Sequence, residues 1–134
     1  MIYIICGLIG AGKTTYAREH FGHVTDYDEI GSKEKQIEET RHLYEEGEDV
    51  AHITCYPTPE EQDFLRTVPA EDVAYLWIAT TPAQARKNIL KRNRPRDMED
   101  IERVIRKNEQ ISYTAGRSRL PFEDIDIFGS GERW

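Results

Sequence analysis

Cysteine is scarce in this chain of 134 residues, which contains only Cys6 and Cys55. Two cysteines cannot build the disulfide framework of a small secreted domain, so we expect free thiols and a reduced, cytoplasmic setting. Apolar residues form no run approaching the ~20 that span a bilayer. No basic segment precedes the short apolar N-terminus, which argues against a signal peptide. We therefore expect neither a membrane protein nor a secreted one.

Basic residues are also outnumbered, because 18 Lys and Arg stand against 25 Asp and Glu, for a formal charge of −7. Such a surface disfavours non-specific binding to nucleic acid, in which neutralisation of phosphates dominates the affinity, although it leaves room for a local basic site. The length suits one domain with a buried core. With no repeat and no linker, the sequence predicts a single domain over 1–134.

Short apolar segments alternate with helix-like segments along the chain. We predict strands at 2–6, 23–25, 50–55, 73–79 and 125–128. Helices are predicted at 13–20, 32–46, from 58, at 81–92 and from 97 or 98 to 116, with Ser32, Thr58 and Thr81 as capping residues. This alternation predicts an α/β fold in which helices cover both faces of a parallel sheet.

A glycine-rich loop carries the strongest functional signal. Residues 7–14 match G-x-x-x-x-G-K-[ST] at every fixed position, between a predicted buried strand and a predicted helix. Glycines let the backbone N–H groups surround a phosphate at a helix N-terminus. Lys13 can reach the β- and γ-phosphates, and the Thr14 hydroxyl can bind Mg²⁺. The candidate nucleotide-binding residues are Gly7, Gly10, Ala11, Gly12, Lys13, Thr14 and Thr15.

Three further stretches accompany the loop: an acidic cluster at 26–29, a turn and helix start at 57–60, and a basic segment at 86–96. With them the sequence resembles P-loop kinases of the nucleotide-kinase group, most of all the small polynucleotide-kinase-like phosphotransferases. The resemblance runs from residue 1 to about 107. It implies a three-layer P-loop kinase fold with five parallel strands ordered 2-3-1-4-5, ATP as phosphoryl donor, Mg²⁺ and a hydroxyl acceptor.

The acidic cluster follows the second predicted strand, at the sheet edge where open parallel sheets bind ligands. A carboxylate there can position the acceptor hydroxyl and take its proton. The resemblance assigns that catalytic role to Asp28, with Asp26 as the reserve candidate, and both are candidate acceptor-binding residues. Some relatives carry an arginine three residues after this aspartate, where this chain has Gly31.

The third predicted strand lacks the acid that many P-loop proteins use to hold Mg²⁺. Thr54 stands at the expected place, and His52 lacks spaced partners, which indicates a packed or solvated histidine. This favours a kinase over a self-sufficient hydrolase, because phosphates and Thr14 can supply most of the Mg²⁺ ligands.

The basic segment around Pro95 predicts a short lid over residues 92–97. An arginine that closes over the transferring phosphoryl group stabilises its developing charge. We expect Arg92 and Arg96 to act catalytically and Arg94 to bind the acceptor. The alternatives are a solvated charge run and a patch that grips the backbone of a nucleic-acid acceptor.

These residues predict a kinase that uses ATP and Mg²⁺. The acceptors that the resemblance implies are a nucleotide, a polynucleotide 5′ end, or a hydroxymethylated base in DNA. The alternatives are a kinase for a small metabolite such as a sugar acid, and a nucleotide-binding switch without efficient transfer.

Overall fold

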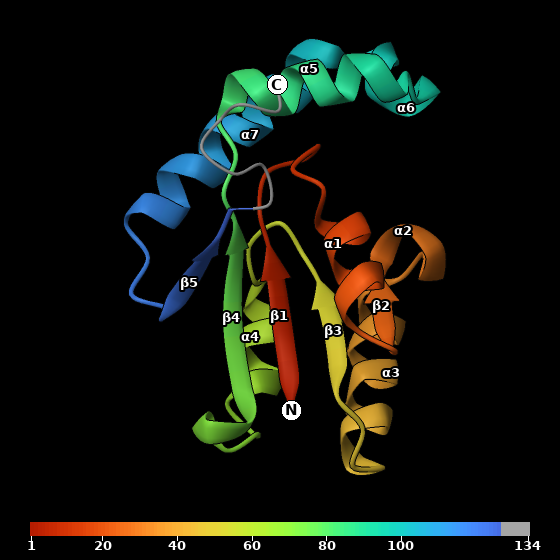
Figure 1. Cartoon of the computed structure of the whole chain (residues 1–134), viewed down its shortest axis with the longest axis vertical. Coiled ribbons are helices and arrows are strands. Elements are labelled where there is room, and N and C mark those ends of the chain that lie inside the picture. The colour runs from red at the N-terminus through yellow and green to blue at the C-terminus, as the bar shows by residue number, and fades with distance from the viewer. Residues whose placement is uncertain (127–134) are drawn as a thin grey trace.

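A single parallel sheet organises the fold (Figure 1). The computed structural model describes residues 1–126, apart from the side chain of Arg96. Its strands are β1 (Ile2–Cys6), β2 (Val24–Asp26), β3 (Val50–Ile53), β4 (Val73–Ile78) and β5 (Phe122–Ile125). They pair in parallel in the order β2-β3-β1-β4-β5. The predicted fold class and strand order are confirmed.

The helices are α1 (Lys13–His20), α2 (Tyr27–Ile30), α3 (Lys33–Glu45), α4 (Pro59–Leu65), α5 (Pro82–Arg92), α6 (Pro95–Glu99) and α7 (Ile101–Gly116), with a 3₁₀ turn at Ala70–Asp72. Three of the helices, α3, α4 and α5, begin at the capping residues that the sequence predicts. The predicted caps Ser32, Thr58 and Thr81 each accept a hydrogen bond from a first-turn N–H, at Lys35, Glu61 and Gln84. No helix among residues 1–126 combines the length and apolarity that crossing a membrane requires.

The sheet is buried on both faces, which explains the unbroken apolar sequence of β1. Ile2 and Ile4 pack on one face in a cluster that includes Ile37 of α3 and Phe64 of α4. On the other face, Ile5 lies in a cluster formed by residues from α1, α5 and α7, among others. In Figure 1, α5, α6 and α7 gather at the end of the sheet toward which the strand arrows point. That carboxyl edge is where the glycine-rich loop emerges from β1.

Several predicted boundaries are wrong; the third strand, for example, was expected to reach 55 and ends at Ile53. The last strand was expected at 125–128, but β5 begins at Phe122, and 127 and 128 lie outside the described residues. Phe122 is placed by tertiary contacts, since its ring meets those of Tyr75 and Trp77 on β4. The helix expected from 97 or 98 is divided at Asp100, whose side chain caps α7 by accepting from the Arg103 N–H.

Candidate active site

The loop of residues 7–14 joins β1 to α1 and has the backbone geometry that anion binding requires. Gly12, the N-cap residue of α1, has φ 91°, and no side chain caps the helix there. The first-turn N–H groups of α1 therefore remain directed at any anion held by the loop. Gly10 has φ 87°, and a Cβ there would lie 2.7 Å from the Ala85 carbonyl oxygen and 2.9 Å from Ile89 Cγ1. Helix α5 thus packs directly on the loop, which only glycine permits.

Lys13 lies across the loop that precedes it. Its Nζ donates to the carbonyl oxygens of Gly7 and Leu8, at 3.0 and 2.8 Å, and lies 3.5 Å from Cys55 Sγ. These acceptors hold the ammonium group at the mouth of the loop. The side chain can exchange two neutral carbonyls for phosphate oxygens, which form stronger charge-assisted hydrogen bonds.

An acid from β2 lies beside the threonine of the loop. Thr14 Oγ1 donates to Asp26 Oδ2 at 3.1 Å, and Asp26 Oδ1 accepts from the Asp28 N–H at 3.0 Å. Asp26 is 7% exposed. A hydroxyl and a carboxylate are hard oxygen donors of the kind that Mg²⁺ prefers, so this pair fits the metal that the loop implies. Among residues 1–126, no group of three or more His, Cys, Asp and Glu side chains could hold a metal ion.

Thr54, at the place where an acid was missing, makes its hydrogen bonds outside this pair. Its Oγ1 hydrogen bonds to Glu61 Oε1 at 3.0 Å and to the Tyr56 carbonyl oxygen at 3.3 Å. The carboxylate beside the Thr14 hydroxyl therefore comes from β2 and not from β3. The sequence held a signal for this, because Asp26 ends a strand that neighbours β3 in the sheet.

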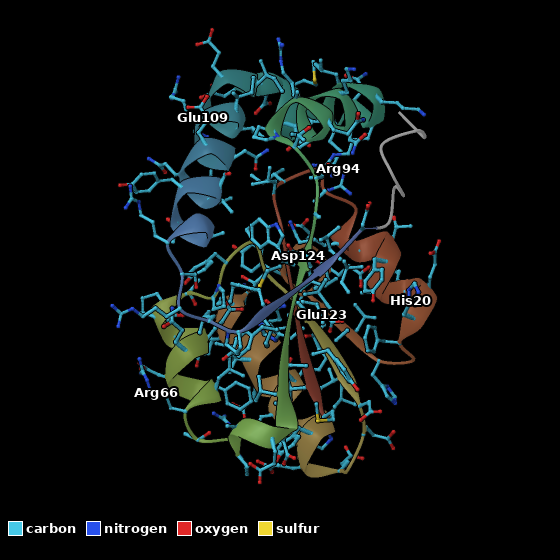
Figure 2. The ribbon with its side chains drawn as sticks, turned by 60° about the vertical axis from the view of Figure 1, so that its left-hand side comes forward. His20, Arg66, Arg94, Glu109, Glu123 and Asp124 are labelled. Atoms are coloured by element: carbon cyan, nitrogen blue, oxygen red, sulfur yellow. The ribbon has the colours of Figure 1, made fainter. Side chains whose placement is uncertain are left out.

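Beside Thr14 and Asp26 there is a cavity of about 360 Å³, which brings together several of the predicted residues. Asp28 is about half exposed, and its Oδ2 lies 3.6 Å from Arg94 Nη1. In Figure 2, Arg94 lies between the helices at the top of the molecule and the sheet. The cavity is lined by Thr14, Arg18, Asp26, Asp28, Glu29 and Arg94. Sequence reasoning missed Arg18 and Glu29, whose side chains form an ion pair.

The other predicted lid arginines are placed differently. Arg92 donates from Nε and Nη2 to Asp97 Oδ2, at 3.2 and 2.9 Å, and Asp97 is 5% exposed. Arg92 thereby fastens the end of α5 to α6. The backbone of Arg96 lies in α6, and its side chain is outside the described part of the chain. A catalytic role for either residue stays a prediction.

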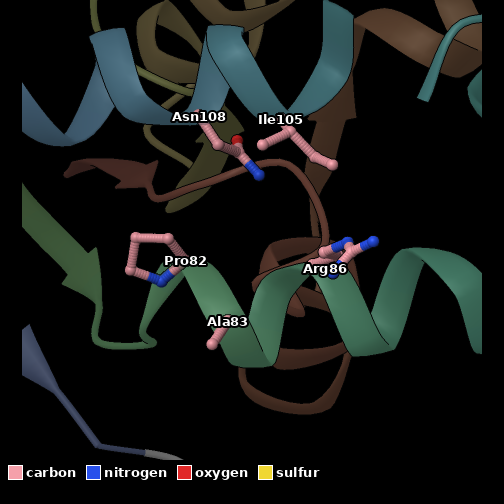
Figure 3. A pocket seen from close by; sticks show the side chains of 5 residues that line it. All are labelled: Pro82, Ala83, Arg86, Ile105 and Asn108. Atoms are coloured by element: carbon pink, nitrogen blue, oxygen red, sulfur yellow. The ribbon is translucent and has the colours of Figure 1, made fainter. Parts of the chain in front are cut away.

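Two asparagines attach helices α5 and α7 to the phosphate loop, and the sequence analysis did not single them out. Asn108 of α7 accepts from the Ile9 N–H at 2.7 Å and donates to the Ile9 carbonyl oxygen at 3.0 Å. Asn88 of α5 donates to the Gly10 carbonyl oxygen at 2.8 Å. Figure 3 shows Asn108 directed from α7 toward the loop, beside a cavity of about 150 Å³ between α5 and α7. The available signal was an amide on the apolar face of the helix, between Val104 and Ile111.

A buried polar network joins β3 to α3 and α4. His52 and Glu61 are each 1% exposed and share a hydrogen bond between Nε2 and Oε2, and Lys33 Nζ lies 3.2 Å from the same Glu61 oxygen. Burial raises the pKa of Glu61, but hydrogen bonding and charge from His52, the Thr58 N–H and Lys33 lower it to about 2. His52 is thus a packed histidine, one of the two states expected from the sequence.

A parallel β2-β3-β1-β4-β5 sheet with a phosphate-binding loop after its central strand has the P-loop kinase fold. Solved structures share this fold over most of the chain. A deoxyadenosine kinase from M. mycoides, with bound dATP, superposes with a TM-score of 0.57 at 17% identity, covering 94% of this chain and 91% of that one. A gluconokinase from Sinorhizobium meliloti 1021 gives 0.59 at 12% identity, with coverages of 93% and 81%.

A sugar kinase from Janibacter sp. HTCC2649, solved without ligand, gives a TM-score of 0.59 at 18% identity, covering 93% of this chain and 84% of that one. At these identities the likeness shows the fold. No protein-family model and no curated protein matches the sequence. The narrower resemblance to polynucleotide-kinase-like phosphotransferases stays a prediction.

Proposed function

We propose that this protein is an ATP- and Mg²⁺-dependent kinase that transfers the γ-phosphoryl group to a hydroxyl acceptor. The observation that carries the proposal is one cavity at the carboxyl edge of the sheet. It is lined by the threonine of the phosphate loop, the aspartate that ends β2, a second aspartate from α2, and an arginine from the predicted lid. Phosphoryl transfer needs these groups together, because its catalysis consists of positioning and stabilisation of charge.

The loop is assigned to the donor. The backbone of Gly7, Gly10, Ala11 and Gly12 and the side chains of Lys13, Thr14 and Thr15 would bind the ATP phosphates. Thr14 would hold Mg²⁺, with the Asp26 carboxylate beside it. A magnesium ion held there would supply positive charge that stabilises the phosphates of ATP.

Asp28 is assigned to the acceptor as the group that takes the hydroxyl proton. Both oxygens of the buried Asp26 accept hydrogen bonds from this chain, whereas Asp28 is about half exposed on the cavity. The guanidinium of Arg94 lies beside Asp28 and would hold the acceptor against it. Arg92 and Arg96 remain assigned to the transferring phosphoryl group, with Arg92 exchanging Asp97 for phosphate when the lid closes.

Two acceptor classes are supported by the solved structures of this fold. One is a nucleoside or nucleotide, since a deoxyadenosine kinase shares the fold, and a polynucleotide 5′ end or a hydroxymethylated base in DNA extends this class. The other is a sugar or sugar acid, since a gluconokinase and a sugar kinase share it equally well.

A label-transfer assay tests the proposal. The protein is incubated with γ-labelled ATP, Mg²⁺ and a panel of nucleosides, nucleotides, 5′-hydroxyl oligonucleotides, sugars and sugar acids. We expect label in one acceptor class, with the label absent in Lys13→Ala and strongly reduced in Asp28→Asn. Asp63→Asn, which neutralises an exposed carboxylate on α4, is the matched control and should transfer normally. Release of inorganic phosphate without any labelled acceptor would support a nucleotide-binding switch and contradict the kinase.

A further inference from the structure

The cavity beside the loop contains an ion pair that neither metal binding nor proton transfer uses. Arg18 of α1 and Glu29 of α2 contact each other in its lining, each with slightly more than half of its side chain exposed. Arg18 lies four residues after Thr14, so both side chains project from the same face of α1 toward the cavity. The pair therefore lies next to the metal-binding threonine and the acceptor aspartate, and not on a remote surface.

The ion pair between Arg18 and Glu29 contributes little to the stability of the fold. Exposed ion pairs contribute about 0–1 kcal/mol, because solvent screens them and both side chains lose rotamer freedom. Glu29 belongs to a helix of only four residues, and its half-exposed carboxylate can turn into water without disturbing the core. The pair is thus a contact that another anion can replace at small cost. By contrast, the carboxylate of Asp26 is buried and held by two hydrogen bonds.

The other charges of the cavity already have partners in the proposed reaction. Asp26 stays with Thr14, and Asp28 and Arg94 face each other at 3.6 Å around the place assigned to the acceptor hydroxyl. This leaves the guanidinium of Arg18 as the group whose partner can be exchanged. A guanidinium presents a planar fork of donors that matches the two oxygens of a carboxylate or the oxygens of a phosphate.

We propose that Arg18 binds an anionic group of the acceptor, a carboxylate or a phosphate, and that Glu29 occupies the place of that group until the acceptor arrives. This inference rests on the proposed kinase function and specifies its substrate class. The acceptor carries a hydroxyl for Asp28 and, some ångströms away, an oxyanion for Arg18. A neutral nucleoside or a neutral sugar would leave Arg18 paired with Glu29 and would gain nothing from it.

Substitutions of Arg18 and of Glu29 should change the affinity for an anionic acceptor in opposite directions. Arg18→Gln removes the fork and should weaken binding of an anionic acceptor by at least tenfold, with little effect on its neutral counterpart. Glu29→Gln removes the competing carboxylate and should tighten binding of the anionic acceptor severalfold. The matched controls are Arg41→Gln and Glu38→Gln, which make the same charge changes in an exposed pair on α3 and should alter neither affinity.

Calorimetric titration with the phosphate loop saturated by a non-hydrolysable ATP analogue and Mg²⁺ provides the measurement, because the probe anions then cannot occupy the loop. The probes are two matched pairs, gluconate with glucose, and deoxyadenosine 3′-monophosphate with deoxyadenosine. The first pair tests a carboxylate and the second a phosphate beside a free 5′-hydroxyl. We expect one anionic member to bind at least tenfold more tightly than its neutral partner, and this preference to disappear in Arg18→Gln.

Each of the following results would overturn the inference: equal affinity for both members of each pair, a preference that survives Arg18→Gln, or weaker anion binding in Glu29→Gln. Absence of Arg18-dependent binding for both anionic compounds would overturn it as well. Label transfer on the same samples separates the two proposals. Transfer to a neutral acceptor, unchanged in Arg18→Gln, refutes the anionic subsite and leaves the kinase standing. Failure to bind the ATP analogue at all refutes the kinase.

Discussion

Replacement of Asn108 by leucine tests whether α7 holds the phosphate loop in its binding conformation. The amide of Asn108 is 3% exposed and makes two hydrogen bonds with the backbone of Ile9, 99 residues away in the sequence. Leucine has a similar size and no polar atom. The substitution therefore removes both hydrogen bonds while keeping the apolar face of the helix filled.

The structure allows the size of the effect to be worked out. Each backbone group left without a partner costs about 1–3 kcal/mol when it is buried. Ile9 is only partly buried, so water can satisfy some of this loss, and we expect destabilisation of about 2–4 kcal/mol. Ile9, once released, must be ordered again when ATP binds, at about 1–2 kcal/mol, while Asn88 still holds the Gly10 carbonyl. Since 1.4 kcal/mol is tenfold in affinity, ATP should bind about tenfold more weakly.

Two measurements on two variants separate a loop-positioning role from simple loss of packing. Val104→Ala is the matched control, because Val104 is 7% exposed on α7 and makes no hydrogen bond to the loop. Urea denaturation should show that both variants lose stability, and titration with an ATP analogue should show weaker binding in Asn108→Leu alone. Equal ATP affinities for wild type and Asn108→Leu would refute the reasoning, whatever the loss of stability.

Four further predictions concern the site and its supporting network. Lys13→Ala should abolish label transfer and leave thermal unfolding unchanged, because the ammonium of Lys13 contacts loop carbonyls and not the core. Asp28→Asn should lower kcat about a hundredfold or more at unchanged KM for ATP, whereas Asp26→Asn should raise the Mg²⁺ concentration needed for half-maximal rate; the reverse pattern would exchange their roles. Alanine at Arg92, Arg94 or Arg96 should lower kcat more than ATP affinity, with incomplete rescue by lysine, and three silent variants in steady-state kinetics would refute the lid. Glu61 has a pKa of about 2 in the folded protein against 4.5 ordinarily, so its contribution to stability is complete above pH 4.5 and is lost as the pH falls toward 2; Glu61→Gln should flatten the curve of unfolding free energy against pH in that window.

The features that the sequence predicted correctly are those that local residues determine. The phosphate loop needs particular glycines at fixed spacing, and Thr58 caps α4 through a neighbour three residues away. Such signals lie within one turn of the chain. The order of the strands followed from the resemblance, since alternating strands and helices specify a parallel sheet without giving its order.

The features that escaped prediction depend on contacts between distant segments. β5 begins at Phe122 because that ring packs on Tyr75 and Trp77 of a neighbouring strand. Asn108 reaches Ile9 only because α7 passes over the loop. Arg18 lies within the predicted helix at 13–20, and only the position of α2 brings it into contact with Glu29. Each of these residues has unremarkable neighbours in the sequence, so spacing alone carries no signal for it.

The missing acid of β3 shows how the chain can distribute one chemical task over different strands. Asp26 ends β2, accepts from Thr14 and also caps α2 by accepting from the Asp28 N–H. One carboxylate therefore fixes both the hydroxyl assigned to the metal and the backbone of the residue assigned to the acceptor. Because β2 supplies that carboxylate, the residue after β3 can take part in a structural contact instead. Thr54 there joins Glu61, which ties β3 to α4 beneath the site. The absence of an acid from β3 is thus compatible with phosphoryl transfer, because the neighbouring strand brings a carboxylate to the same edge of the sheet.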